Sequence, residues 1–230
     1  MNLKKLFLDH CDVNQYEINQ DQLDIIENLK KFYLSNFYQT IITKIFRKNK
    51  NRLGFYLVGD VGVGKTMILD FFFKQLEEKK LRLHFNEFMV NFHDYIFQNK
   101  DKESGVINFV KDLSSKVKIL YFDEFQVTNI VDAMILGRLF EKIFDKEIKV
   151  IFSSNIKIND LYKDGLQREQ FIPFIKILKL NCYQKELSIN EDYRSSKNKD
   201  IKRFLTPIDQ STNFSFNEFC RKITKNKKKT

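Results

Sequence analysis

The spacing of hydrophobic positions changes several times along this chain, and each change predicts a new element. Residues 54–58 form an unbroken apolar run beside glycine, which is typical of a strand covered on both faces. Further strands are predicted at 82–85, 118–122, 149–153 and 178–183. Helical spacing of apolar residues is found at 66–79, 88–98, 107–113, 128–144, 160–162 and 167–175. This alternation predicts an α/β fold in which a parallel sheet lies between two helical layers.

The segments outside this alternation predict a simple domain organisation. Apolar residues in 21–48 recur at helical spacing, which predicts two helices joined near Ser35. We therefore interpret residues 1–50 as an N-terminal helical segment and residues 51–195 as the α/β core. Residues 196–230 begin with a polar stretch and end in a run of lysines, so they are interpreted as a linker and a basic tail. A chain of 230 residues is long enough for this one core and its appendages.

The turn after the first predicted strand carries the clearest chemical signal. Its sequence, GDVGVGKT, fits the phosphate-binding pattern Gly-x-x-x-x-Gly-Lys-Thr without a mismatch. Glycines let successive backbone N–H groups face a phosphate, while the lysine reaches the β- and γ-phosphates and the threonine hydroxyl binds Mg²⁺. The predicted nucleotide-binding residues are Gly59, Asp60, Val61, Gly62, Val63, Gly64, Lys65 and Thr66. ATP is favoured over GTP because no Asn-Lys-x-Asp string for reading guanine is found.

Two adjacent carboxylates follow the predicted strand at 118–122. The carboxyl ends of parallel strands are where open α/β sheets bind ligands. Asp123 is therefore predicted to hold Mg²⁺ together with Thr66, and Glu124 to polarise the attacking water as a general base.

Two further polar residues come later in the same order of elements. Asn155 follows the strand at 149–153, where its amide could orient a water against the γ-phosphate, although asparagine at a strand end is commonly a turn residue. Arg168 opens the next helix and has two interpretations from its chemistry. It is either an arginine finger that reaches the γ-phosphate of a neighbouring subunit, or a surface residue paired with Glu169 or Asp164. His84 and His93 are given no catalytic role, because a lone histidine beside a strand is commonly a packing residue.

The composition indicates the net charge of the protein and its expected location. The net charge is +10, which fits either a surface for nucleic acid or acidic lipid, or solvated lysines from a biased coding sequence. We favour the second interpretation, because the lysines are spread along the chain. The cysteines Cys11, Cys182 and Cys220 have no metal-ligand spacing, and no apolar stretch of about 18 residues occurs. A cytoplasmic protein is expected.

Five strings together indicate a family: GDVGVGKTM (59–67), HFNEFM (84–89), FDEFQVT (122–128), DAMILGRLF (132–140) and LYKDGLQRE (161–169). Over residues 20–195 the chain resembles the AAA+ ATPases of the bacterial cell-division protein ZapE type and their mitochondrial relatives. The resemblance implies a P-loop NTPase fold, Mg²⁺-dependent ATP hydrolysis, Asn155 as a sensor, and a homo-oligomeric ring in which Arg168 acts in trans. It also implies a C-terminal helical lid, which is expected to be truncated here.

The resemblance implies a role in cell division or in remodelling a protein partner, with at most peripheral contact with the inner membrane. The alternative is a helicase-loader-like ATPase that acts on nucleic acid, which the basic charge permits but does not favour. A nucleotide-binding scaffold without turnover is the third hypothesis.

Overall fold

A five-stranded parallel sheet organises the protein. The computed structural model describes residues 2–37, 51–98 and 102–188. The chain divides into two units, Met1–Asn190 and Glu191–Thr230, and all of the described residues belong to the first. The expected tail and lid lie outside the described residues. The strands are β1 (Gly54–Val58), β2 (Lys80–His84), β3 (Ile119–Asp123), β4 (Lys149–Ser154) and β5 (Cys182–Glu186). Their order in the sheet is β2-β3-β4-β1-β5, so β1, which leads to Lys65, and β3, which leads to the acidic pair, lie on either side of β4.

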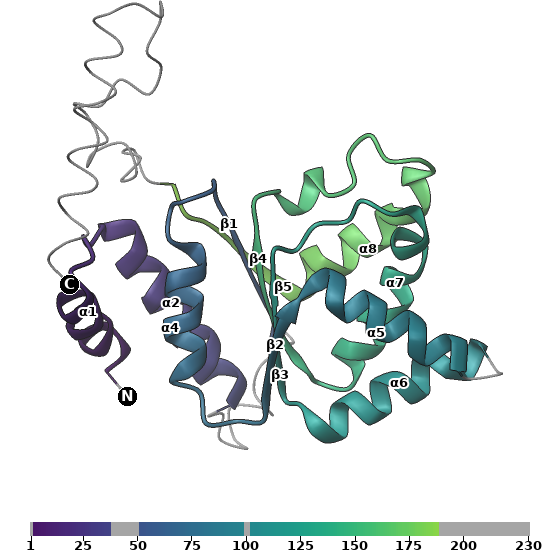
Figure 1. The fold of residues 1–230 in the computed structure, drawn as a ribbon, viewed down its shortest axis with the longest axis horizontal. Helices are drawn as coiled ribbons and strands as arrows, with labels where there is room; N and C mark the ends of the chain where they lie inside the picture. The colour runs from purple at the N-terminus through teal and green to yellow at the C-terminus, as the bar shows by residue number, and fades with distance from the viewer. Residues whose placement is uncertain (1, 38–50, 99–101, 189–230) are drawn as a thin grey trace, which may run out of the picture. The chain divides into compact units, whose positions relative to one another are not determined.

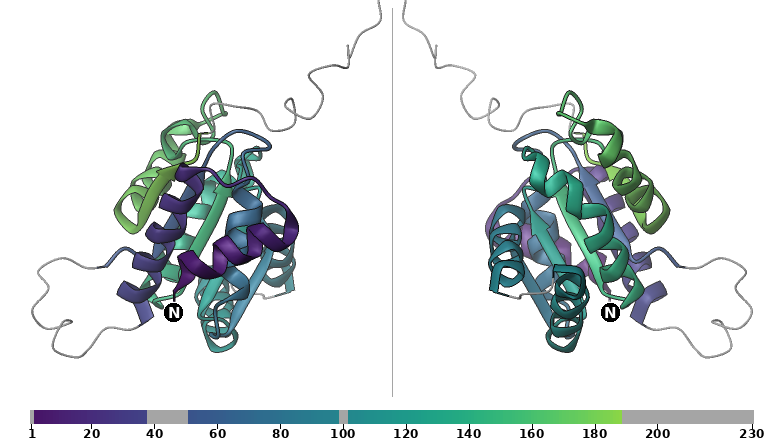
Figure 2. Two further views of the ribbon diagram at one scale, coloured as in Figure 1. Left: turned by 90° about the vertical axis from the view of Figure 1, so that its left-hand side faces the viewer. Right: turned by 90° about the vertical axis from the view of Figure 1, so that its right-hand side faces the viewer.

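Helices cover both faces of the sheet (Figure 1). One face carries α1 (Leu3–Asn14), α2 (Gln20–Phe37) and α4 (Lys65–Lys74). The other carries α5 (Phe85–Gln98), α6 (Lys102–Lys116), α7 (Ile130–Asp145) and α8 (Arg168–Asn181), with the short 3₁₀ turn η1 (Ile158–Asp160) before α8. In Figure 2 the first layer faces the viewer in the left view and the second in the right view. The predicted three-layer α/β sandwich is confirmed.

Two hydrophobic cores result from the alternation of side chains along each strand. Phe55 and Leu57 of β1 pack toward α1, α2 and α4, whereas Tyr56 and Val58 pack toward α5 to α8. Every residue of β1 and β3 is buried, which explains why these strands are continuous apolar runs rather than alternating ones. Because the central strands are covered on both faces, function is confined to their ends and to the loops that follow them.

The helical layers correct three sequence expectations. Helix α1 lies within the helical segment expected over residues 1–50, and its exposed Asp9 and Asp12 lie outside the buried stripe of Leu3, Phe7 and Cys11. Helix α2 continues through Ser35 and Asn36 to Phe37, and both polar side chains are accommodated within it by donating to the Phe32 carbonyl. Residues 38–48 of the second expected helix lie outside the described ranges.

At the end of the core, residues 178–181 belong to α8 rather than to the last strand, which starts at Cys182. Buried Leu178 continues the apolar stripe of α8 through Phe171, Phe174 and Ile175, and short apolar runs of this kind do not separate helix from strand. The helix expected over 160–162 is the 3₁₀ turn Ile158–Asp160. None of the helices within the described ranges has the length and apolarity needed to cross a membrane.

Candidate active site

The phosphate loop joins the carboxyl end of β1 to the first turn of α4. Gly62 and Gly64 have φ values of 92° and 94°, a left-handed region that residues with a Cβ rarely adopt. The Gly59 N–H donates to the Ser154 carbonyl at 3.2 Å, which anchors the start of the loop to β4. On the other side, the buried amide of Gln22 lies 3.5 Å from the Val63 carbonyl, which connects the loop to α2. The loop is therefore held in shape from two neighbouring elements.

Lys65 is a nearly buried cation, 7% exposed, at the start of α4. Its ammonium donates to the carbonyl oxygens of Gly59 and Asp60, both at 2.7 Å, and to Oδ1 of Asn155 at 2.8 Å. These acceptors are neutral, and burial lowers the pKa of the Lys65 ammonium. Among the described residues no carboxylate contacts this ammonium, and a cation held by neutral acceptors suits an anionic ligand such as a triphosphate.

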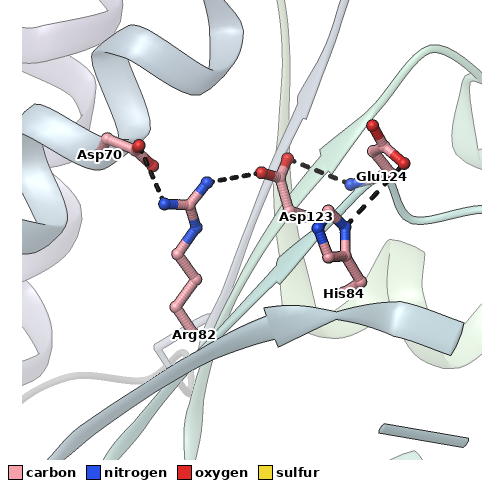
Figure 3. Close-up of polar contacts among 5 residues, drawn as sticks. All are labelled: Asp70, Arg82, His84, Asp123 and Glu124. Atoms are coloured by element: carbon pink, nitrogen blue, oxygen red, sulfur yellow. Dashed lines mark hydrogen bonds and ion pairs between the residues drawn. The ribbon is translucent and has the colours of Figure 1, made fainter. Parts of the chain in front are cut away.

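Asp123 is the buried member of the acidic pair and ends β3. It is 5% exposed, and both of its carboxylate oxygens accept a hydrogen bond. Oδ1 accepts from the Glu124 N–H at 3.1 Å, and Oδ2 accepts from the guanidinium of Arg82 at 2.7 Å (Figure 3). Arg82 also donates to Asp70 of α4 at 2.9 Å. Sequence reasoning missed both residues, because Arg82 reaches Asp123 only through the pairing of β2 with β3, and Asp70 of α4 is linked to Asp123 only through Arg82.

Glu124 lies on the solvent side of this buried carboxylate. Its backbone has a φ of 52°, in the left-handed region, and its side chain is 80% exposed. The carboxylate is 3.9 Å from Nδ1 of His84, as Figure 3 shows. Glu124 is therefore free to approach a ligand from the solvent, as a general base should be. Its neighbour His84 was given no role from the sequence.

Thr66, the second residue of α4, is exposed and lies one helical turn before Asp70. Mg²⁺ in nucleotide sites is held by hydroxyl and carboxylate oxygens together with the phosphates of the substrate. Thr66 and Asp123 would supply those oxygens, and Lys65 would supply the positive charge beside them. The donor set therefore fits ATP with Mg²⁺, the ligands expected from the sequence.

Asn155 and Arg168 differ in how the structure places them. Asn155 contacts Lys65 directly, so the predicted sensor and the phosphate-loop lysine are together in the folded chain. Arg168 is half-buried, and its guanidinium donates to the Asn159 carbonyl at 2.8 Å. Within the described residues, Arg168 forms no ion pair with Glu169 or Asp164, so the surface pairing considered from the sequence is absent. Its action on a neighbouring subunit stays a prediction.

The comparison with known proteins decides the family. Residues 8–230 match the family described as AFG1-like ATPase. The chain belongs to the AFG1-like ATPase family. It is 38% identical to the Schizosaccharomyces pombe protein C115.02c over 67% of this chain and 36% of the relative. It is 37% identical to Lactation elevated protein 1 homolog B of Danio rerio over 65% of this chain and 32% of the relative.

A third AFG1-like relative is the Escherichia coli cell division protein ZapE, which is 34% identical over 69% of this chain and 43% of the relative. The family expected from the five sequence strings is thus confirmed. The chain matches less than half the length of these curated relatives.

Solved structures support the AAA+ fold of this AFG1-like chain. AMPPCP-bound DnaA from Aquifex aeolicus matches with a TM-score of 0.52 and 15% identity, over 83% of this chain and 56% of that one. A DNA replication initiation factor matches with a TM-score of 0.52 and 16% identity, over 80% of this chain and 51% of that one. At these identities the likeness concerns the fold alone.

Proposed function

We propose that the protein is a Mg²⁺-dependent AAA+ ATPase that hydrolyses ATP to ADP and phosphate in an oligomeric ring. The observation that carries this proposal is the environment of Lys65, a nearly buried cation whose three contacting acceptors are neutral. In the sheet, β4 separates β1 from β3, so the ends that lead to Lys65, Asn155 and Asp123 are adjacent. That is the arrangement needed to bind a triphosphate and a metal together.

The proposed roles follow from each side chain. Lys65 releases the loop carbonyls and binds the β- and γ-phosphates, while the loop N–H groups bind the remaining phosphate oxygens. Mg²⁺, when bound, neutralises charge on the phosphates. Asn155, which already contacts Lys65, orients the attacking water, and Glu124 accepts a proton from that water. The water oxygen bonds to the γ-phosphorus while the bond from that phosphorus to the β–γ bridging oxygen breaks, so that ADP leaves. The exposed Glu124 turns from His84 toward the ligand for this step.

Arg168 is proposed to complete the site of a neighbouring subunit. Its position at the first turn of α8, held by the Asn159 carbonyl, leaves it half-buried rather than covered. An arginine supplied in trans accelerates phosphoryl transfer by about 10³–10⁵-fold. The ring is proposed to use turnover to remodel a protein partner, with a role in cell division suggested by the name of the ZapE relative. A cytoplasmic location, at most peripheral to a membrane, is part of this proposal.

A subunit-mixing experiment tests the proposal. Glu124→Gln and Arg168→Ala should each be almost inactive alone, at any protein concentration. In a mixture, a site in an Arg168→Ala subunit keeps Glu124 and receives Arg168 from its neighbour, so ATP turnover should reappear. Turnover by the unmutated protein should also rise per subunit as concentration increases. A mixture that stays inactive, beside an active unmutated protein, would refute the action of Arg168 in trans.

The basic charge supports one second candidate, an ATPase that acts on nucleic acid. Binding of single-stranded DNA that weakens steeply with log salt, with a slope for several phosphates, would favour this candidate over protein remodelling. Lys65→Ala serves as the common control, because all ATP-dependent readouts should be lost in that variant.

A further inference from the structure

Arg82 connects the two elements that carry the proposed metal ligands. One nitrogen of its guanidinium donates to Asp123 of β3 at 2.7 Å, and another donates to Asp70 of α4 at 2.9 Å (Figure 3). Asp70 lies one helical turn after Thr66 on the same helix. Arg82 itself comes from β2, the edge strand next to β3. A single side chain therefore fixes Asp123 relative to the helix that begins with the phosphate-binding residues.

The packing around Arg82 holds this geometry. Its guanidinium lies over the ring of Tyr121, 5.1 Å from the centroid, and Tyr121 is the residue of β3 paired with Arg82 across the ladder. Tyr121 and Asp123 are two residues apart on one strand, so both point to the face that α4 covers. The planar guanidinium of an arginine is held in one orientation by stacking on a ring and by two fixed acceptors. The flexible ammonium of a lysine would not be held in this way.

Asp123 depends on this arginine for its own orientation. Its carboxylate has about four lone-pair sites, of which the Glu124 N–H and Arg82 occupy two. The other sites stay available to water in the coordination sphere of a metal. Without Arg82, the nearly buried Asp123 would lose its charged donor, and the guanidinium would no longer offset the repulsion between Asp123 and Asp70. The carboxylate would then lose the contact that fixes its rotamer.

We propose that Arg82 is a positioning residue of the magnesium site: it holds Asp123 against the phosphate-loop helix through Asp70 and thereby strengthens Mg²⁺-dependent nucleotide binding. This inference rests on the proposed function, because it needs a site that binds ATP with Mg²⁺. Arg82 is 38% exposed at its side chain, so its charge is partly screened by solvent, and the expected effect comes from geometry. Residues that hydrogen-bond to a metal ligand and orient it contribute about 10- to 100-fold to metal affinity.

The test measures binding rather than turnover. A fluorescent ATP analogue such as mant-ATP is titrated into the full chain in EDTA and then at increasing free Mg²⁺. Arg82→Met keeps an apolar stem over Tyr121. In this variant, the Mg²⁺ concentration that gives half of the Mg²⁺-dependent increase in mant-ATP binding should rise by about 10- to 100-fold. Binding in EDTA should change little, because Lys65 and the loop are untouched.

Arg52→Met is the matched control. Arg52 also lies over a tyrosine ring, 5.3 Å from the Tyr183 centroid, and donates to the Cys182 carbonyl at 3.0 Å. It sits beside β5 at the opposite edge of the sheet, so its removal should leave the Mg²⁺ dependence unchanged. Thermal unfolding of both variants reports whether the fold is retained.

Two more variants separate positioning from simple charge. Asp70→Asn should weaken the Mg²⁺ dependence less than Arg82→Met, and the double variant should be no worse than Arg82→Met, since Asp70 acts through Arg82. Unchanged or tighter Mg²⁺ dependence in folded Arg82→Met would overturn the inference and leave the proposed ATPase intact. If Arg82→Met is unfolded, a normal Mg²⁺ dependence in Asp70→Asn would overturn the inference, and a weakened one would support it. If Mg²⁺ does not tighten nucleotide binding to the unmutated protein, both this inference and the proposed Mg²⁺-dependent ATPase are refuted.

Discussion

Phe125, the residue directly after the acidic pair, is predicted to be a large contributor to the stability of the site. Its side chain is 1% exposed and lies among rings from five other elements. The centroid distances are 4.5 Å to Phe85 and 4.8 Å to Phe152, with Tyr56, Phe140 and Phe174 slightly farther away. Its backbone is also fixed, because its N–H donates to the Ser153 carbonyl and its carbonyl accepts from the Ser154 hydroxyl, both at 2.7 Å.

Phe125→Ala would remove a ring that these neighbours cannot replace, and the free energy of unfolding should fall by about 3–5 kcal/mol. For a chain of this size, each kcal/mol corresponds to a shift of about 2–4 °C in the unfolding midpoint. The expected decrease is therefore roughly 6–20 °C. That is a large share of the roughly 5–15 kcal/mol that stabilises a typical domain.

Urea unfolding followed by far-UV circular dichroism at 25 °C measures this change, provided that the slope with denaturant is the same for both proteins. Phe97→Ala is the matched control, because Phe97 is 91% exposed on α5 and its loss should change stability by less than about 0.5 kcal/mol. A loss below about 1 kcal/mol for Phe125→Ala, or equal losses for the two variants, would contradict the packing described here.

Three other predictions follow from named residues. Glu124→Gln should keep Mg²⁺-dependent ATP binding but lower turnover by about 10²–10⁴-fold, measured as phosphate release; near-normal turnover would exclude Glu124 as the base. Gly64→Ala should cost about 1–2 kcal/mol of stability, because its φ of 94° is unfavourable for any residue with a Cβ, whereas Gly137→Ala inside α7 should cost nothing in the same unfolding experiment. In a Cys220→Ser background, neither Cys11 nor Cys182 should react with Ellman's reagent until the protein unfolds, since both thiols are buried and burial raises the pKa of each; reaction in the native state would contradict that burial.

Where local sequence patterns were strong, they were sufficient to predict the element or loop. The phosphate loop was readable because its glycines, Lys65 and Thr66 are contiguous, and the chemistry requires them at fixed spacing on one turn. The strands β1 and β3 were readable because both faces are covered, which leaves no polar residue in either run except the terminal aspartate. The polar Ser35 and Asn36 misled the same reasoning, because periodicity does not report which polar residues a helix tolerates.

The sequence alone identified the candidate binding groups: the loop at 59–66, the acidic pair Asp123 and Glu124, and Asn155 beside them. Only the tertiary structure decided which of these meet. The hydrogen bond between Lys65 and Asn155 joins residues 90 positions apart, and the bridge from Asp70 through Arg82 to Asp123 requires β2 to pair with β3. Strand order in a parallel sheet is set by the packing of whole layers, so no local pattern around Arg82 could show that it holds the buried carboxylate.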